Sequence, residues 1–349
     1  MLRKMECGSA CNGHVAKGCE HCINGSKMVL LVTGQCKWNC YYCPVSLEKK
    51  GLDVIYANEA KVSTDEEVIA EAESMDATGT GMTGGDPLLA IDRTLHFIRL
   101  LKERFGKDHH IHLYTATFDQ EKVRLLEEAG LDEIRFHPMI SMWTHMNDTC
   151  LRDIVSSTTM DVGIEVPAIS GKEKELSELV RYADSVGVKF INFNELEFSE
   201  SNWNMMSQNG FEVKDDISSA VKGSHETALS VMKANRKINI HLCSSAFKDG
   251  VQLRKRLIRR AEHICTDYQA VTDDGTLVRG FVYSGDLDAI VSELRELDVP
   301  DELFIVLDNK VEVAPWVLED IADELGFKCY ISEQYPTADG LEVERTPLN

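Results

Sequence analysis

Three cysteines on one short segment carry the clearest chemical signal in this chain. Cys36, Cys40 and Cys43 follow the apolar run 28–34 with the spacing Cys-x3-Cys-x2-Cys. Iron–sulfur clusters are normally held by four cysteine thiolates. A local set of three can hold a [4Fe–4S] cluster in which one iron has no protein ligand. The spacing therefore predicts a reactive cluster whose open iron binds a small molecule, and the alternative is a zinc knuckle or a group of buried free thiols.

A second group of cysteines precedes the first. Its members are Cys7, Cys11, Cys19 and Cys22, with His14 and His21 between them. Cys19 and Cys22 have the Cys-x2-Cys spacing of a metal-binding pair, and four soft ligands suit a structural zinc ion or an auxiliary iron–sulfur cluster. Cys243 or Cys265 could complete such a site. The alternative is a disordered, reduced N-terminal tail.

The composition indicates a cytoplasmic globular protein. Of 349 residues, 43% are hydrophobic and 27% are charged, which is ordinary for a folded domain. We expect no membrane partner, since no apolar run is long enough to span a bilayer and the first residues lack the apolar core of a signal peptide. The net charge of -21 opposes general binding to nucleic acid. The 11 cysteines are an odd number, which favours metal ligation over disulfides.

Short apolar segments that alternate with amphipathic ones must position these cysteines. We expect strands at 28–32, 79–83, 110–114, 133–137, 163–168, 190–194 and 238–242. A capping box at 64–67 begins one intervening helix, and Gly130 and Gly187 end two others. Such βα repetition predicts a parallel sheet with functional residues at the carboxyl ends of its strands. Residues 195–208 look like a loop, and the C-terminal third has strands at 277–283 and 303–307 and a helix at 316–325.

Two further motifs accompany the cysteine loop. Tyr42 precedes its last cysteine, and Gly84-Gly85-Asp86-Pro87 ends the second strand. Together with Cys36, Cys40 and Cys43 they resemble the signature of the radical S-adenosylmethionine (SAM) superfamily. In that family, SAM chelates the open iron of the [4Fe–4S] cluster, and its reductive cleavage gives a 5′-deoxyadenosyl radical that abstracts hydrogen from a substrate.

The resemblance also implies a fold and further site residues. It implies an α/β fold with a partial (β/α)6 barrel, which we place at 28–245, between a cysteine-rich metal-binding segment at 1–27 and an α+β C-terminal extension at 246–349 that covers the barrel. Tyr42 would pack beside the adenine, and backbone carbonyls of Gly84, Gly85, Asp86 and Pro87 would bind the SAM amino group. Asp86 stands where the family usually has glutamate.

Candidates for the remaining SAM contacts stand at strand ends. They are Thr115, His137, Glu165 and Asn194. Each has an alternative role as a capping or hydrogen-bonded polar residue.

A closer resemblance extends over nearly the whole chain. The segments 19–22, 25–30, 43–46, 56–59, 83–87, 110–115 and 335–339 resemble an archaeal group of radical SAM proteins related to pyruvate formate-lyase activating enzyme. That resemblance does not specify a substrate. Activating enzymes typically lack the N-terminal cysteines and the long C-terminal extension, which argues against glycyl-radical activation.

The segment 248–260 is basic in an otherwise acidic chain. Six of its 13 residues are Lys or Arg, and apolar residues at helical spacing predict an amphipathic helix. The helix could bind an anionic substrate such as RNA phosphates. The alternative is a solvated face paired with neighbouring acids.

We therefore expect an enzyme that cleaves SAM with an electron from a reductant such as ferredoxin or flavodoxin. RNA, a protein and a small molecule remain open as substrates. A hypothesis of another class is a non-catalytic metal-binding or redox-sensing protein that uses the N-terminal cysteines.

Overall fold

The chain folds into two compact units in a computed structural model that describes residues 2–349. The first unit holds the chain up to Ala72 and Ala77–Leu253, and the second holds Glu73–Asp76 and Arg254–Asn349. The division at Leu253 falls inside the basic segment 248–260. The predicted coverage of the barrel by the C-terminal extension remains a prediction.

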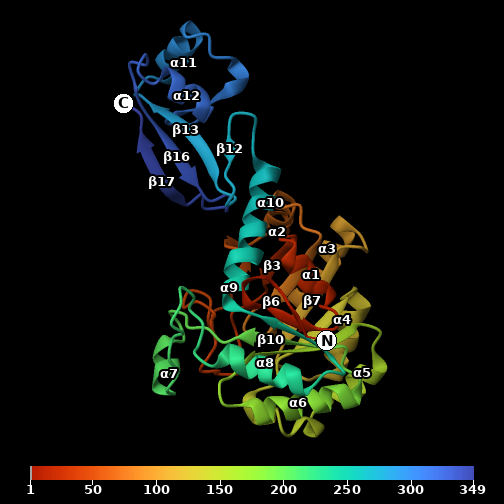
Figure 1. The fold of residues 1–349 in the computed structure, drawn as a ribbon. Coiled ribbons are helices and arrows are strands. Elements are labelled where there is room, and N and C mark those ends of the chain that lie inside the picture. The colour runs from red at the N-terminus through yellow and green to blue at the C-terminus, as the bar shows by residue number, and fades with distance from the viewer. Residues whose placement is uncertain (1) are drawn as a thin grey trace. The chain divides into compact units, whose positions relative to one another are not determined.

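Seven parallel strands form the centre of the first unit (Figure 1). In spatial order they are β3 (Lys27–Leu31), β6 (Gly79–Thr83), β7 (His110–Thr115), β8 (Glu133–Phe136), β9 (Asp161–Ala168), β10 (Phe190–Glu195) and β11 (Asn239–Cys243). The antiparallel hairpin β4–β5 (Ile55–Ala57 and Ala60–Val62) extends the β3 side, and β1–β2 (Leu2–Lys4 and Ala10–Asn12) extends the β11 side. The strand order has two free ends among residues 2–349, so the expected partial barrel is confirmed.

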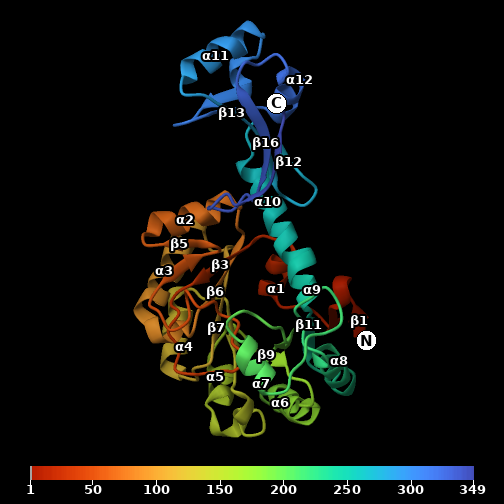
Figure 2. The same ribbon diagram turned by 90° about the vertical axis from the view of Figure 1, so that its left-hand side faces the viewer.

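Helices cover the outer face of this sheet (Figure 2). They are α2 (Asp65–Ser74), α3 (Ile91–Phe105), α4 (Gln120–Ala129), α5 (Leu151–Ser157), α6 (Glu173–Val186) and α8 (Ser224–Ala234). The capping box at the start of α2 is present, because Thr64 donates its N–H to Glu67 at 3.0 Å and Glu67 donates its own to the Thr64 hydroxyl at 3.3 Å. Gly130 and Gly187 end α4 and α6 with left-handed φ of 104° and 87°.

The helix α1 (Lys17–Ile23) lies instead on the inner side of the barrel. Its approach depends on Gly18, because a Cβ there would lie 2.4 Å from Nδ1 of His112 and 2.7 Å from Nη2 of Arg135. Glu133 accepts the Gly18 N–H at 3.2 Å and holds the helix in place. The N-terminal cysteine segment is therefore a folded part of the barrel, and the alternative of a disordered tail is wrong for residues 2–27.

The prediction of a loop at 195–208 is wrong at both ends of that range. β10 continues to Glu195, and a short helix α7 spans Trp203–Gln208. Its sequence has no helical apolar repeat, so a tertiary contact must support it. The Asn202 side chain before α7 donates to the carbonyl oxygens of Tyr42 at 3.2 Å and Glu197 at 3.1 Å.

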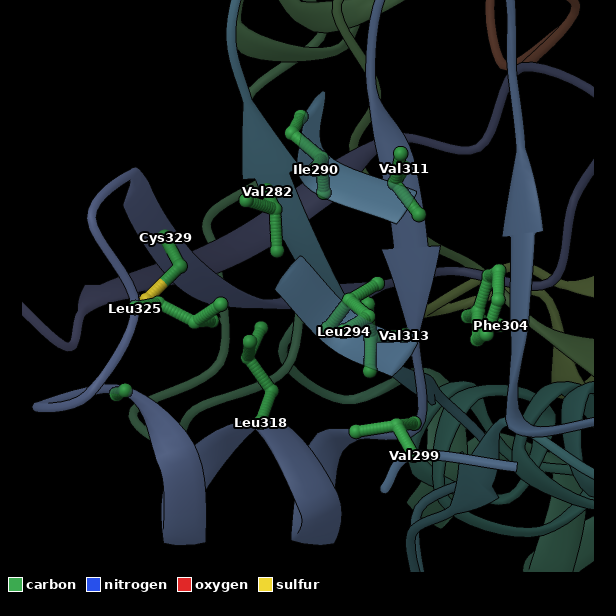
Figure 3. Packing of buried hydrophobic residues seen from close by; sticks show 11 residues of the cluster. Val282, Ile290, Leu294, Val299, Phe304, Val311, Val313, Leu318, Leu325 and Cys329 are labelled. Atoms are coloured by element: carbon green, nitrogen blue, oxygen red, sulfur yellow. The ribbon is translucent and has the colours of Figure 1, made fainter. Parts of the chain in front are cut away.

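The second unit is built on an antiparallel sheet. Its strands are β12 (Ala270–Val271), β13 (Leu277–Tyr283), β14 (Phe304–Val306), β15 (Val311–Val313), β16 (Lys328–Gln334) and β17 (Glu342–Pro347), and its helices are α10 (Arg254–Ile264), α11 (Leu287–Glu296) and α12 (Pro315–Ile321). The predicted strand 277–283 is confirmed, whereas the predicted helix 316–325 ends at Ile321. Figure 3 shows the core, in which Val282, Ile290, Leu294 and Leu318 pack between the sheet and the helices.

The predicted basic helix is present. Lys248–Leu253 forms a turn of π-helix that runs directly into α10. Nowhere in residues 2–349 is a helix both long enough and apolar enough to cross a membrane.

Buried histidine should make the fold sensitive to acid. His109 is 3% exposed and its Nε2 lies 2.9 Å from the Thr80 hydroxyl, and burial lowers its pKa from 6.5 to about 4. Below pH 6.5 the unfolded chain binds a proton at His109, whereas the folded chain does not until the pH approaches about 4. The stability that this residue contributes is therefore fully present above pH 6.5 and is lost on acidification. We expect a loss of roughly 3 kcal/mol between pH 6.5 and about 4 from this residue.

Urea unfolding of His109→Gln across that range should show a shallower pH dependence than the wild type. His14→Gln is the matched control, since His14 is exposed. Equal slopes for His109→Gln and the wild type would contradict the prediction.

Candidate active site

The three loop cysteines lie at the carboxyl edge of the parallel strands. Cys36, Cys40 and Cys43 come from the segment that follows β3, and all three line one cavity of about 610 Å³. A cavity of this size holds a ligand as large as a cofactor. All 11 cysteines of the chain are free. Soft ligands from one loop thus open onto a space for a second molecule.

Hydrogen bonds hold the cysteine loop at both of its ends. Gly34 donates its N–H to Leu52 at 2.9 Å, and Gly51 donates back to Gly34 at 2.8 Å. On the other side, the carbonyl of Cys43 accepts from the Ser201 hydroxyl at 3.2 Å. These bonds fix the loop's backbone where the thiols must converge.

The glycine pair after β6 lies directly against the cysteine loop. The Gly85 N–H donates to the Thr33 carbonyl at 2.8 Å. A Cβ added at Gly84 would lie 2.3 Å from that same oxygen, and one at Gly85 would lie 2.2 Å from the Gln35 carbonyl. Only residues without a Cβ allow this approach, so the glycines place bare backbone at the cavity wall.

Asp86 stabilises the turn that contains Gly84 and Gly85 through its hydrogen bonds. Its side chain is 1% exposed and accepts hydrogen bonds from the Leu88 N–H at 3.1 Å and from the hydroxyls of Thr115 and Thr117 at 2.7 Å each. Neither Asp86 nor Pro87 lines the cavity, whereas Thr115 does. The carboxylate thus clamps the end of β6 to the end of β7, a role that the motif alone did not reveal.

Tyr42 and His137 form a hydrogen-bonded pair on the wall. The Nδ1 of His137 lies 2.8 Å from the Glu165 carbonyl, which can only accept, so this nitrogen carries the proton. Nε2 is then free to accept from the Tyr42 hydroxyl at 3.1 Å. Burial lowers the pKa of His137, which keeps the ring neutral at pH 7. The pair fixes the Tyr42 ring at the cavity.

Glu165 joins the cavity to the polar interior of the barrel. Its carboxylate accepts from Arg135 at 2.7 Å and from the amides of Asn192 and Asn194 at 2.9 Å each. Burial by itself would raise the pKa of Glu165, but Arg135 and the two amides outweigh burial and lower the pKa. An ionised carboxylate therefore lies at the cavity floor beside Asn194.

Ten of the twelve residues predicted for the cluster and SAM thus face one cavity. They are Cys36, Cys40, Tyr42, Cys43, Gly84, Gly85, Thr115, His137, Glu165 and Asn194. As the side chains stand, no three His, Cys, Asp or Glu groups in residues 2–349 surround one metal position. Binding at the loop therefore requires the thiols to rotate. The donor set and the glycine wall otherwise fit a [4Fe–4S] cluster with SAM.

The structure places the predicted second group of cysteines at different sites. Cys19 and Cys22 of α1 line a separate interior cavity with Cys243, the last residue of β11. Cys11 is buried on β2, where Arg3 contacts its sulfur at 3.2 Å, and Cys7 is exposed. Cys265 lies in the second unit. The expected set of Cys7, Cys11, Cys19 and Cys22 is therefore divided.

Sequence reasoning missed two parts of the wall. Lys248 lines the cavity and forms an ion pair with Glu197 at 3.0 Å. The Sδ of Met139 lies 3.5 Å from the Cys40 sulfur. The sequence placed Lys248 in the basic segment, but the ion pair of Lys248 forms with Glu197, which lies 51 positions away in the chain. No pattern marks Met139.

Comparison with known proteins identifies the family. Residues 30–139 match the radical SAM superfamily, and residues 275–348 match a domain of unknown function, DUF8061. A protein from Methanocaldococcus jannaschii, provisionally named a glycyl-radical enzyme activating enzyme, is 43% identical over 349 residues, which cover 95% of this chain and 92% of that protein. The chain belongs to the radical SAM superfamily. It is a radical SAM enzyme, and membership of this family supports a reaction in which SAM is cleaved to form a radical.

Solved structures with more distant similarity include SuiB and HydG. SuiB from Streptococcus suis, bound to SAM, is 11% identical with a TM-score of 0.41, over 64% of this chain and 51% of SuiB. HydG, a maturase of the [FeFe]-hydrogenase, is 15% identical with a TM-score of 0.44, over 69% of this chain and 65% of HydG. This radical SAM enzyme thus spans about half the length of SuiB.

The close approach at Gly84 can be tested by substitution. Gly84→Ala forces a Cβ against the Thr33 carbonyl, so β6 and the cysteine loop must move apart. We expect a loss of about 1–3 kcal/mol of stability from overpacking. SAM binding should weaken at least tenfold, measured by equilibrium dialysis.

The matched control is Gly285→Ala, where an added Cβ meets no atom within 4 Å. It should bind SAM as the wild type does. Wild-type affinity in Gly84→Ala would show that the glycine wall does not bind the cofactor.

Proposed function

We propose that this enzyme cleaves SAM reductively at a [4Fe–4S] cluster held by Cys36, Cys40 and Cys43. The observation that carries the proposal is the convergence of the cysteine loop, the glycine wall and four strand ends on one cavity. When bound, the cluster and SAM would supply a 5′-deoxyadenosyl radical for hydrogen abstraction. The protein's own part is to bind, to orient and to exclude water.

Each wall of the cavity has a proposed task. Gly84 and Gly85 present backbone carbonyls to the SAM amino group, while Asp86 keeps their turn rigid. Tyr42, fixed by His137, packs beside the adenine. Glu165 and Asn194 present a charged and a neutral polar group at the cavity floor, where hydroxyl or amino groups of the ligand can bond to them.

We infer a protein substrate. The relative from Methanocaldococcus jannaschii is named for activating a glycyl-radical enzyme, and it matches nearly the full length of this chain. A reductant such as ferredoxin or flavodoxin would supply the electron. The N-terminal cysteines and the C-terminal extension, which activating enzymes typically lack, leave room for a modification other than glycyl-radical formation.

The basic side chains of the helix are engaged by the protein itself, which argues against RNA as the substrate. Arg254 pairs with Asp274 at 3.0 Å, and Arg259 pairs with Asp76. Arg260 is buried and donates to the Pro336 carbonyl. Guanidinium groups already engaged by the protein are poorly available to phosphates. This pattern agrees with the alternative of a face paired with neighbouring acids.

Anaerobic reconstitution with iron and sulfide, followed by dithionite and SAM, tests the proposal. We expect the wild type to form 5′-deoxyadenosine, detected by chromatography and mass spectrometry. Cys40→Ala should reduce the product to background, because a cluster with only two protein ligands is not retained.

Cys265→Ala is the matched control, since that thiol lies in the second unit and donates to the carbonyl oxygens of Thr266 and Gln269. It should form the product at the wild-type level. A cluster-loaded wild type that gives no 5′-deoxyadenosine would favour the non-catalytic metal-binding or redox-sensing alternative.

A further inference from the structure

A second cavity of about 220 Å³ lies inside the barrel, next to the SAM cavity. The two cavities share four lining residues, Tyr114, Glu165, Asn194 and Lys248. The walls that belong to the second cavity alone come from α1, β11, other strands of the sheet and the π-helical turn Lys248–Leu253. This interior cavity has a composition that the SAM site does not explain.

Three cysteines face the interior cavity from two distant parts of the chain. Cys19 and Cys22 lie three residues apart on α1, so they share one face of the helix. Cys243 ends β11, where it points inward with His241 because alternate residues of a strand share a face. The fold thus brings Cys243 to the Cys19 and Cys22 pair, from which the sequence separates it by more than 200 positions.

His241 gives independent support for a ligand in this cavity. The residue is 2% exposed, and neither of its ring nitrogens has a hydrogen-bond partner. Buried polar groups are almost always paired, so an imidazole with two unpartnered nitrogens at a cavity wall requires an explanation. Imidazole and thiolate together are a typical ligand set for zinc and for iron–sulfur centres.

Two amide groups donate to the sulfurs. Asn192 Nδ2 lies 3.1 Å from Sγ of Cys19, and Gln252 Nε2 lies 3.4 Å from Sγ of Cys243. Thiolate sulfur is the better acceptor of such bonds, and donors of this kind tune the metal centres that thiolates hold. Burial raises the pKa of Cys19 and of Cys243, so the two amide donors offset part of the cost of the thiolate form that a metal requires.

Three cations and three carboxylates lie in or beside the interior cavity, and two of the cations form direct ion pairs. Arg135 pairs with Glu133 and Glu165, and Lys248 pairs with Glu197. Lys27 also lines the cavity, yet among residues 2–349 no carboxylate forms an ion pair with it. A thiolate-ligated centre would bring negative charge next to Lys27, the cation of these three that has no direct ion-pair partner in the part of the chain that the structure describes.

We propose that Cys19, Cys22 and Cys243, with His241, ligate a second metal centre inside the barrel, beside the SAM cavity. The space favours an iron–sulfur cluster over a single zinc ion, since about 220 Å³ equals roughly seven water volumes of about 30 Å³ each. As at the loop, the thiols must rotate to ligate. Cys7 and Cys11 do not line the cavity and take no part.

The test uses the full chain with Cys36→Ala, Cys40→Ala and Cys43→Ala, which removes the loop cluster. After anaerobic reconstitution, this triple variant should still retain iron and acid-labile sulfide. Adding Cys22→Ser should reduce both to background. Adding Cys7→Ser, the matched control, should leave both unchanged.

Each outcome decides the proposal separately from SAM cleavage, because the triple variant cannot form the loop cluster. Absence of metal in the triple variant, or loss with Cys7→Ser and not with Cys22→Ser, would overturn the site. Zinc in place of iron, lost with Cys22→Ser, would support the ligands and overturn the cluster.

Circular dichroism checks that each variant is folded. If the combined changes unfold the barrel, Cys22→Ser in the otherwise unaltered chain decides. It should hold less iron than the wild type by one cluster, and His241→Ala should alter the electron paramagnetic resonance of that cluster. Unchanged iron in Cys22→Ser would overturn the proposal.

Discussion

The barrel is organised around a guanidinium group that has almost no access to water. Arg135 on β8 is 2% exposed and bonds to Glu133 at 2.5 Å and to Glu165 at 2.7 Å. Its charge would be prohibitive in this interior without those partners. Glu133 also accepts the Gly18 N–H, and Glu165 reaches the floor of the larger cavity. One buried cation therefore ties α1 to the strands and keeps Glu165 ionised at the cavity floor.

This polar centre explains why the two cavities lie next to each other. A barrel interior filled with apolar side chains would leave no open space below the larger cavity. Here the inward positions of β7 to β11 carry polar groups instead, among them Tyr114, Asn192 and His241. Such groups cannot close over one another as tightly as branched apolar residues do. They leave a space that is lined by donors, acceptors and thiols.

The elements were largely predictable, because each has a local cause. The apolar runs of β6 and β13 gave strand limits that match the structure, and the glycines that end α4 and α6 act through their own backbone conformation. The helix α7 was not predictable, since its support comes from contacts of Asn202 with Tyr42 and Glu197. Long-range hydrogen bonds leave no periodic pattern in the sequence.

By itself, the sequence determined the chemistry of the candidate site. The spacing of Cys36, Cys40 and Cys43 and the glycines at 84 and 85 act over a few residues, so the chain carries them as readable motifs. Only the tertiary structure decided which distant groups meet. It separated Cys7 from Cys19, assigned Asp86 to a clamp, and brought Cys243 to α1. Strand order and the inward direction of side chains set those contacts, and both depend on how the whole sheet wraps around α1.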